Sequence, residues 1–125
     1  MGFNYVNNTD ANVDVIVDSV TQAVVGLRNR KTGDETYFPR VIEVTESRAL
    51  NKYDNGATLD CTTSGLTLTA PAGLVNFGCA IINNTTTIAF SGGVTGNGAT
   101  TNIELTAAVG AIVPTSTANA YKVVG

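Results

Sequence analysis

The sequence predicts an all-β protein, an antiparallel β-sandwich or barrel of short strands with a β-hairpin in its N-terminal part. The apolar residues fall into short segments, many of them β-branched, that recur between turn residues at the spacing of such a fold. In the segment 66–70, leucine and alanine alternate with threonine. This alternation predicts a strand with one buried face and one threonine face.

The first half of the chain contains segments typical of strands at 13–18, 23–29 and 35–45. A helix over 11–27 is the alternative, but the valine and isoleucine residues that would form its apolar face are β-branched and favour strands. Gly33 can adopt a positive φ in the turn that precedes the third segment, which predicts a hairpin over 23–45. Pro39 cannot donate a ladder hydrogen bond, so it predicts an edge or a bulge.

The second half contains further candidate strands, at 57–61, 66–71, 77–84, 86–93, 102–107, 111–115 and 120–124. Two asparagines at 83–84 separate two apolar runs and predict a hairpin. The stretch 91–101, SGGVTGNGATT, has glycines spaced as in a phosphate-binding loop, but Ala99 stands where that motif has lysine. No helical pattern follows it, so we expect a loop between strands.

Charge divides the chain into two parts. Six of its seven basic residues lie between positions 28 and 52, whereas residues 53–125 carry four charged residues and ten of the thirteen glycines. We therefore expect an N-terminal arm and hairpin module over 1–52, and a glycine- and threonine-rich sandwich or barrel module over 53–125. The boundary is expected near 52–55.

The residue types present predict a protein without enzymatic activity, cofactor or metal. The chain has no histidine, which excludes the usual nucleophile–histidine arrangements. Two cysteines without histidine cannot supply four zinc ligands. Glu43 and Glu46 are a conceivable glycosidase pair, but Arg40 and Arg48 lie nearby in sequence and favour surface ion pairs instead.

Two further features have a simple structural interpretation. Asp10, Asn12 and Asp14 are spaced like the start of a calcium loop, but the glycine and the glutamate which that loop requires are missing, so we expect solvated side chains. Cys61 and Cys79 are expected to be free, buried thiols, because the N-terminus lacks the pattern of an export signal.

The charge and hydropathy of the chain restrict its partners. The net charge of −3 predicts neither a nucleic-acid nor a membrane partner. No apolar run approaches the roughly 18 residues that a membrane span needs, so we expect the chain to stay in the cytoplasm where it is made.

The segment 28–40, RNRKTGDETYFPR, combines basic and aromatic residues, which are the types that anchor protein interfaces. The alternative is a hairpin with an exposed charged tip, with Phe38 in the core of its own module. The candidate docking residues are Arg28, Arg30, Lys31, Tyr37, Phe38 and Arg40.

Three segments, LTLTAPAGL at 66–74, AIINN at 80–84 and NAYKVVG at 119–125, resemble the glycine- and threonine-rich β domains of tailed-bacteriophage virion proteins. Such domains occur in capsid decoration (cement) proteins and in tail-fibre modules, and the resemblance covers about residues 57–125.

The resemblance implies a small structural protein, usually a homotrimer, that is made in the host cytoplasm and binds the major capsid protein on the outside of the virion. The candidate residues of segment 28–40 would then dock on the capsid. A short chain favours decoration, and the alternative is a tail-fibre or receptor-binding module that recognises a glycan.

Overall fold

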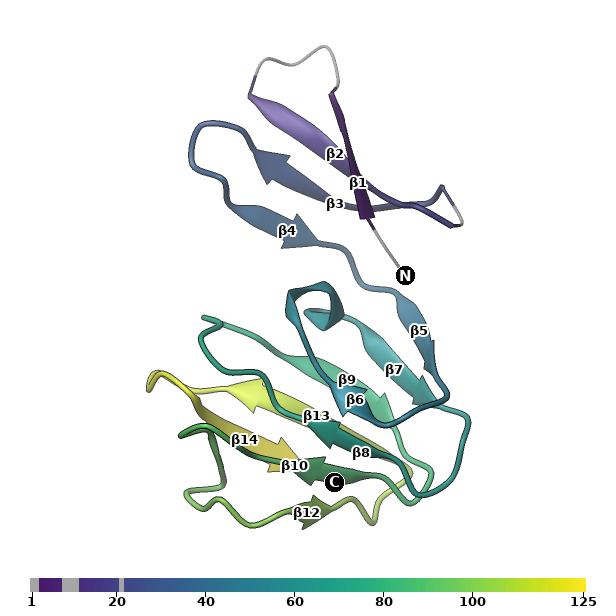
Figure 1. The fold of residues 1–125 in the computed structure, drawn as a ribbon, viewed down its shortest axis with the longest axis vertical. Helices are drawn as coiled ribbons and strands as arrows, with labels where there is room; N and C mark the ends of the chain where they lie inside the picture. The colour runs from purple at the N-terminus through teal and green to yellow at the C-terminus, as the bar shows by residue number, and fades with distance from the viewer. Residues whose placement is uncertain (1–2, 8–11, 21) are drawn as a thin grey trace. The chain divides into compact units, whose positions relative to one another are not determined.

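The chain is all-β in a computed structural model that describes residues 3–7, 12–20 and 22–125, which confirms the predicted fold class (Figure 1). The regular elements of this part are short strands and one 3₁₀ turn, Lys52–Asp54. None of its helical segments is long and apolar enough to cross a bilayer.

The contacts within the chain define two compact units, Met1–Arg40 (unit 1) and Val41–Gly125 (unit 2). The charge distribution placed the boundary about a dozen residues later, near 52–55. Residues 41–49 belong to unit 2 because their two strands are hydrogen-bonded to strands that follow residue 57. The distribution of charged residues reflects which segments are exposed, whereas backbone hydrogen bonds between strands determine which segments belong to one unit.

Unit 1 is a four-stranded antiparallel sheet with the order β1-β2-β3-β4. The hairpin predicted over 23–45 forms only over β3 and β4, where Leu27 pairs with Thr36, and the part of the prediction beyond Pro39 is wrong because residues 41–44 pair with a strand of unit 2. The hairpin ends before Pro39, which follows the edge strand β4, and the sheet's bulge lies at Ile16/Val17 instead. The strands are β1 (Phe3–Asn7), β2 (Val13–Asp18), β3 (Val24–Asn29) and β4 (Glu35–Tyr37).

The register gives this sheet two different faces. One cross-strand row consists of Tyr5, Ile16, Gly26 and Tyr37, and the row beside it consists of Val6, Val15, Leu27 and Thr36. Because neighbouring residues of a strand point to opposite faces, these two rows lie on opposite sides. One face therefore carries aromatic and charged side chains, and the other is mainly aliphatic.

Unit 2 is built from two sheets, and successive strands from β5 to β12 alternate between them. The larger sheet has the order β11-β14-β13-β9-β7-β5, and the smaller has the order β12-β10-β8-β6. The larger sheet contains β5 (Val41–Val44), β7 (Thr58–Cys61), β9 (Cys79–Ile82), β11 (Thr95–Gly96), β13 (Val109–Pro114) and β14 (Ala120–Val124). The smaller contains β6 (Arg48–Ala49), β8 (Thr67–Thr69), β10 (Thr87–Ala89) and β12 (Ile103–Glu104).

Many of the pairings in unit 2 are parallel. Strands β5, β7 and β9 pair in parallel in one sheet, and β6, β8 and β10 pair in parallel in the other. Two consecutive strands of the chain, one in each sheet, therefore form one coil that stacks on the previous coil. This is the arrangement of a short β-solenoid. Antiparallel pairing of β12 with β10, and of β13 with β9 and β14, completes the two sheets.

The hairpin predicted at Asn83–Asn84 does not form, because β9 and β10 lie in different sheets. The side-chain oxygen of Asn83 accepts the backbone N–H of Thr86 at 2.8 Å. Its amide nitrogen donates to the carbonyl oxygens of Leu105 and Ala107, both at 2.9 Å. Asn83 thus fixes a corner at which the chain passes from one sheet to the other.

The two sheets enclose one core. Leu59, Ile81 and Ile112 of the larger sheet and Leu68 and Ile88 of the smaller sheet are at most 1% exposed. The alternation in segment 66–70 is confirmed, since Leu68 is buried while the flanking threonines are partly exposed. Burying each such side chain contributes about 1.5–3 kcal/mol.

The glycine-rich stretch 91–101 lies between strands, as predicted, and contains β11. Asn97 and Gly98 have positive φ values of 53° and 82° and form a tight turn between the bridged residues Gly96 and Ala99. The Asn97 side chain donates to the carbonyl of Val123 at 3.1 Å and accepts its N–H at 3.0 Å. The stretch is thus a turn anchored to β14, and the next element is the strand β12.

Candidate functional site

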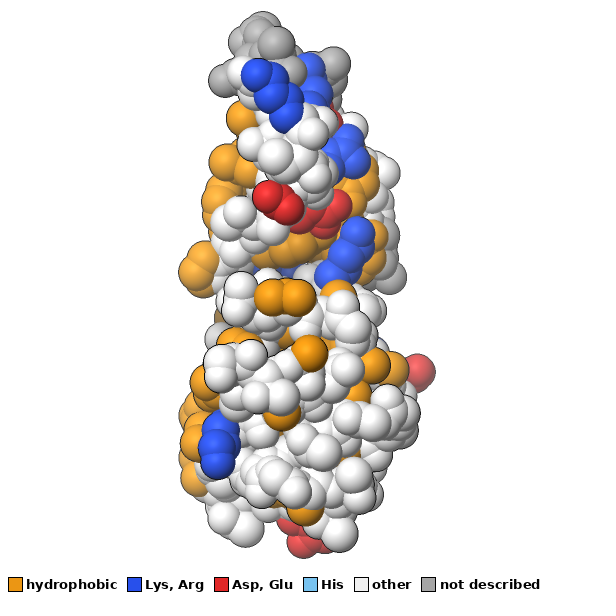
Figure 2. Space-filling view, turned by 90° about the vertical axis from the view of Figure 1, so that its left-hand side faces the viewer, with side chains coloured by type: hydrophobic (Ala, Val, Ile, Leu, Met, Phe, Trp, Pro, Cys, Tyr) orange, Lys and Arg blue, Asp and Glu red, His pale blue; other side chains and the backbone are white. Residues whose placement is uncertain are grey.

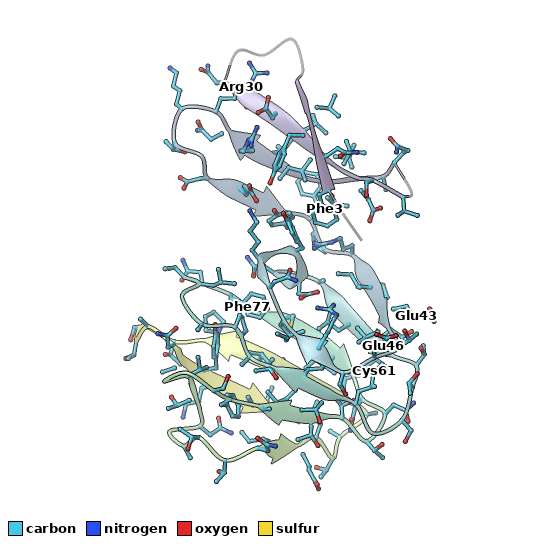
Figure 3. All side chains as sticks on the ribbon, viewed as in Figure 1. Phe3, Arg30, Glu43, Glu46, Cys61 and Phe77 are labelled. Atoms are coloured by element: carbon cyan, nitrogen blue, oxygen red, sulfur yellow. The ribbon has the colours of Figure 1, made fainter. Side chains whose placement is uncertain are left out.

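The charged and aromatic side of the unit 1 sheet is the candidate site, and we call it the arginine–tyrosine face. All four strands of the sheet and the residues that flank them contribute to it. Arg30 and Phe3 lie toward opposite ends of the sheet (Figure 3). The face comprises Phe3, Tyr5, Asp14, Arg28, Arg30, Glu35, Tyr37 and Arg40.

Asp14 holds two of the arginines. Its side chain is 8% exposed and accepts from Nη2 of Arg28 at 2.6 Å and from Nε of Arg30 at 2.5 Å. Asp14 and Arg28 are directly opposite each other in the register of β2 and β3. The hydrogen bonds from Arg28 and Arg30 lower the pKa of the Asp14 carboxyl, and the bond to Asp14 raises the pKa of Arg28.

Glu35 accepts hydrogen bonds from the two tyrosine hydroxyls of the face. The hydroxyl of Tyr5 donates to one oxygen of the carboxylate at 2.7 Å, and the hydroxyl of Tyr37 donates to the other. The guanidinium carbon of Arg28 lies 3.9 Å from the centre of the Tyr5 ring, a cation–π contact. The Asp14 and Glu35 clusters are therefore joined through Arg28 and Tyr5.

Arg40 lies over the aromatic end of the face. Its guanidinium carbon is 5.4 Å from the ring centre of Tyr37 and 5.7 Å from that of Phe3. Its Nη1 donates to the backbone carbonyl of Phe38 at 3.0 Å. The rings of Phe3 and Tyr37 are 5.9 Å apart. Such contacts hold the guanidinium in one orientation on a partly exposed surface.

The structure brings four of the six predicted docking residues together, namely Arg28, Arg30, Tyr37 and Arg40. Lys31 is exposed in the turn after β3, and Phe38, 38% exposed, follows β4. Sequence patterns did not indicate the partners Phe3, Tyr5 and Glu35, and they grouped Asp14 with a calcium-like run instead of with the arginines. The alternation of aromatic residues at positions 3 and 5 was a usable signal for the first strand.

The calcium-like run is not a set of solvated side chains as expected. Asp14 is buried and bound by Arg28 and Arg30, so that expectation is wrong for it, whereas Asn12 is exposed and Asp10 lies outside the described residues. Across residues 3–7, 12–20 and 22–125, no group of three or more histidine, cysteine, aspartate or glutamate side chains is placed to hold a metal ion.

Glu43 and Glu46 are exposed, at the end of β5 and in the turn that follows (Figure 3). The expectation that Arg48 pairs with these glutamates is wrong. Its guanidinium binds the buried carboxylate of Asp54 at 2.7 Å. The acidic partner of Arg48 comes from the 3₁₀ turn after β6, a contact that sequence proximity did not indicate.

Cys61 and Cys79 are free and buried, as predicted. Burial raises the pKa of both thiols, that of Cys79 to about 12. Both side chains belong to the core of unit 2. They are therefore packing residues of the two sheets.

Unit 2 also has a surface pocket of about 470 Å³ beside β6 and β8. Its lining is mainly apolar, with Leu50, Ala70 and Leu74, and includes the polar side chains of Asn51 and Thr69. Its size is within the range of small-ligand sites.

Comparisons of the chain with protein-family models, with curated proteins and with solved structures gave no match.

Proposed function

We propose that this protein is a non-enzymatic structural protein of a tailed-bacteriophage virion, a decoration protein that binds the major capsid protein on the outer surface of the shell. The observation that supports docking most directly is the arginine–tyrosine face, in which Asp14 and Glu35 hold arginine and tyrosine side chains in place. The resemblance of residues 57–125 to virion β domains supports the particle as the location.

The arginine–tyrosine face suits a protein partner. Arginine and tyrosine are the residue types that most often dominate interface energies. Side chains that are already held in one orientation lose less conformational entropy on binding. The two guanidinium groups around Asp14 carry two positive charges against the single negative charge of its carboxylate. The cluster is therefore net positive and complementary to acidic surface on the partner.

The smaller sheet of unit 2 has an outer surface that suits exposure to solvent. The visible side of unit 2 in Figure 2 is mostly white, the colour of backbone and uncharged polar side chains. The outward residues of its smaller sheet include Thr67, Thr69 and Thr87. A neutral polar surface of this kind fits the part of a decoration protein that faces away from the shell.

The second candidate is a tail-fibre or receptor-binding module that recognises a glycan, and the pocket beside β6 and β8 favours it. The copy number on purified particles separates the two candidates. A decoration protein is expected at hundreds of copies per particle, and a tail protein at a few. Quantitative mass spectrometry of purified virions measures this number, and absence from the particle would contradict both.

Variants test the docking face on capsids that lack the protein. We expect Tyr37→Ala to weaken binding about tenfold or more, as the loss of an anchor does, and Arg30→Ala to act less strongly. Lys52→Ala, in unit 2, is the matched control and is expected to bind as the wild type.

The ring of Tyr37 also packs within unit 1, so thermal unfolding must be measured beside occupancy. Tyr37→Phe keeps the ring and removes only the hydroxyl that binds Glu35. A folded Tyr37→Ala variant that still saturates the capsid would show that the docking surface lies elsewhere.

A further inference from the structure

The outer faces of the two sheets of unit 2 differ in composition. On the smaller sheet, the outward positions are polar or small: they comprise Thr67, Thr69, Thr87, Glu104, Ala49 and Ala89. On the larger sheet, the outward positions form a cross-strand row of small apolar residues and one threonine. That row runs through β5, β7, β9, β13 and β14 and consists of Val41, Thr58, Ala80, Ala111 and Val124.

Large aliphatic side chains are exposed across this outer face. The exposed fractions of these residues range from 38% to 68%, although their neighbours along the strands are buried in the core. Contiguous apolar surface of this kind usually marks an interaction site. The exposed aliphatic residues are Val41, Ile82, Val109, Val113 and Val124.

The charges on the same face lie at two opposite corners. Glu43 and Asp60 are adjacent in the register of β5 and β7, in the row that continues to Ile82 and Val109. Lys122 of β14 pairs with Val113, two residues along β13 from Ala111 and on the other side of the apolar row. In the described part of the chain, no ion pair involves Glu43, Asp60 or Lys122.

We propose that this outer face of the larger sheet binds a second copy of the chain, face to face, in a two-fold symmetric dimer. A two-fold axis in the plane of the contact exchanges opposite corners of the face. When this axis is perpendicular to the line that joins the two corners, Lys122 of each copy meets Glu43 and Asp60 of the other, and the apolar rows of the two copies cross at the centre of the contact. A face with a neutral apolar centre, an acidic corner and an opposite basic corner is therefore complementary to the same face of a second copy.

The size of the face predicts a weak dimer. Five strands about 4.8 Å apart, each of four to six residues and so about 13–20 Å long, give roughly 400 Å² per copy, below the standard size of specific interfaces. We therefore expect dissociation in the micromolar range or above. The proposal concerns unit 2 alone, differs from the homotrimer that the resemblance implies, and does not depend on the function proposed for the arginine–tyrosine face.

Charge reversal provides the test, with sedimentation velocity over a concentration series as the measurement. Lys122→Glu gives two acidic corners, and Glu43→Lys/Asp60→Lys gives two basic corners, so each variant alone is expected to dimerise at least about tenfold more weakly. An equimolar mixture of the two variants pairs opposite charges at both corners. It is expected to form heterodimers with an affinity near that of the wild type.

Two further variants, one control and one disruptive substitution, complete the test. Lys52→Glu makes the same charge change outside the face and is expected to leave dimerisation unaltered. Val109→Asp places a charge on the apolar part of the face, at a side chain that is 57% exposed, and is expected to abolish dimerisation in a folded protein. The proposal is overturned if the wild type stays monomeric over the whole concentration series, or if these variants leave its association unchanged. It is also overturned if the equimolar mixture does not restore dimerisation.

Discussion

The carboxylate of Asp54 is bound by the guanidinium of Arg48 through two hydrogen bonds of 2.7 Å, one on each oxygen. Asp54 is 2% exposed and also accepts the backbone N–H of Asn51 at 2.9 Å, which caps the 3₁₀ turn Lys52–Asp54. The hydrogen bonds to Asp54 raise the pKa of Arg48. This ion pair joins β6 to the turn that leads into β7.

Arg48→Ala is expected to lower the free energy of unfolding by about 2–4 kcal/mol, because it leaves a buried carboxylate without its cation. Chemical denaturation with urea measures this change. Glu46→Ala, an exposed position in the same loop, is the control and should change the free energy by less than about 0.5 kcal/mol. Equal stability of the two variants would show that the ion pair does not stabilise unit 2.

The pair between Asp14 and its two arginines predicts a pH dependence of stability. Because hydrogen bonds from Arg28 and Arg30 lower the folded-state pKa of Asp14 below its ordinary value of 3.8, the folded state binds the proton less readily than the unfolded state. The stabilisation is therefore complete above about pH 4 and is lost as the pH falls toward the folded-state pKa.

Asp14→Asn removes this titration. The difference in unfolding temperature between wild type and Asp14→Asn is expected to be constant from about pH 5 to 7 and to shrink below about pH 4. Thermal unfolding at a series of pH values measures this difference. A difference that stays constant or grows on acidification would contradict the assigned pairing.

Local patterns predicted where the strands lie, but not how they pair. The alternation in segment 66–70 is set by burial of one face, so it locates β8. Parallel stacking of β8 between β6 and β10 joins segments about twenty residues apart, and alternation carries no strand direction. The asparagine turn after β9 was misinterpreted for this reason, since hairpins and sheet-changing corners use the same residue types.

The candidate site was predictable in composition and not in connectivity. Arg28 and Tyr37 were selected because their types anchor interfaces. Their partners Asp14 and Tyr5 come from β2 and β1, and only the strand order and register bring them together. The pairing matters because it changes Arg28 from a free surface charge into a fixed donor.

The buried thiols predict a loss of stability at high pH. Burial raises the pKa of Cys79 from 9.0 to about 12, so the unfolded state releases its thiol proton first. Stability is therefore full below about pH 9 and falls as the pH rises toward 12. Cys79→Ala should weaken this dependence, as measured by urea denaturation at several pH values.

Thiol labelling provides an independent check on the same two residues. Native protein at pH 8 is expected to react slowly at Cys61 and Cys79, and urea-unfolded protein to react rapidly at both, because thiolate formation and access are both suppressed by burial. Rapid labelling of either thiol in the native state would contradict their placement in the core.

Gly96 and Phe90 give the last prediction. A Cβ built on Gly96 would lie 2.0 Å from Cζ of Phe90, whose ring is 8% exposed in the core. Gly96→Ala must therefore displace the ring and is expected to lower the free energy of unfolding by about 1–3 kcal/mol. Phe90→Leu alone is expected to lower it by about 1–2 kcal/mol through lost packing. In the double variant, the smaller side chain leaves room for the new methyl group, so the combined loss should be at least about 0.5 kcal/mol less than the sum of the two single losses. Urea denaturation of the four proteins measures this coupling, and strictly additive losses would mean that the ring does not determine the need for glycine at position 96.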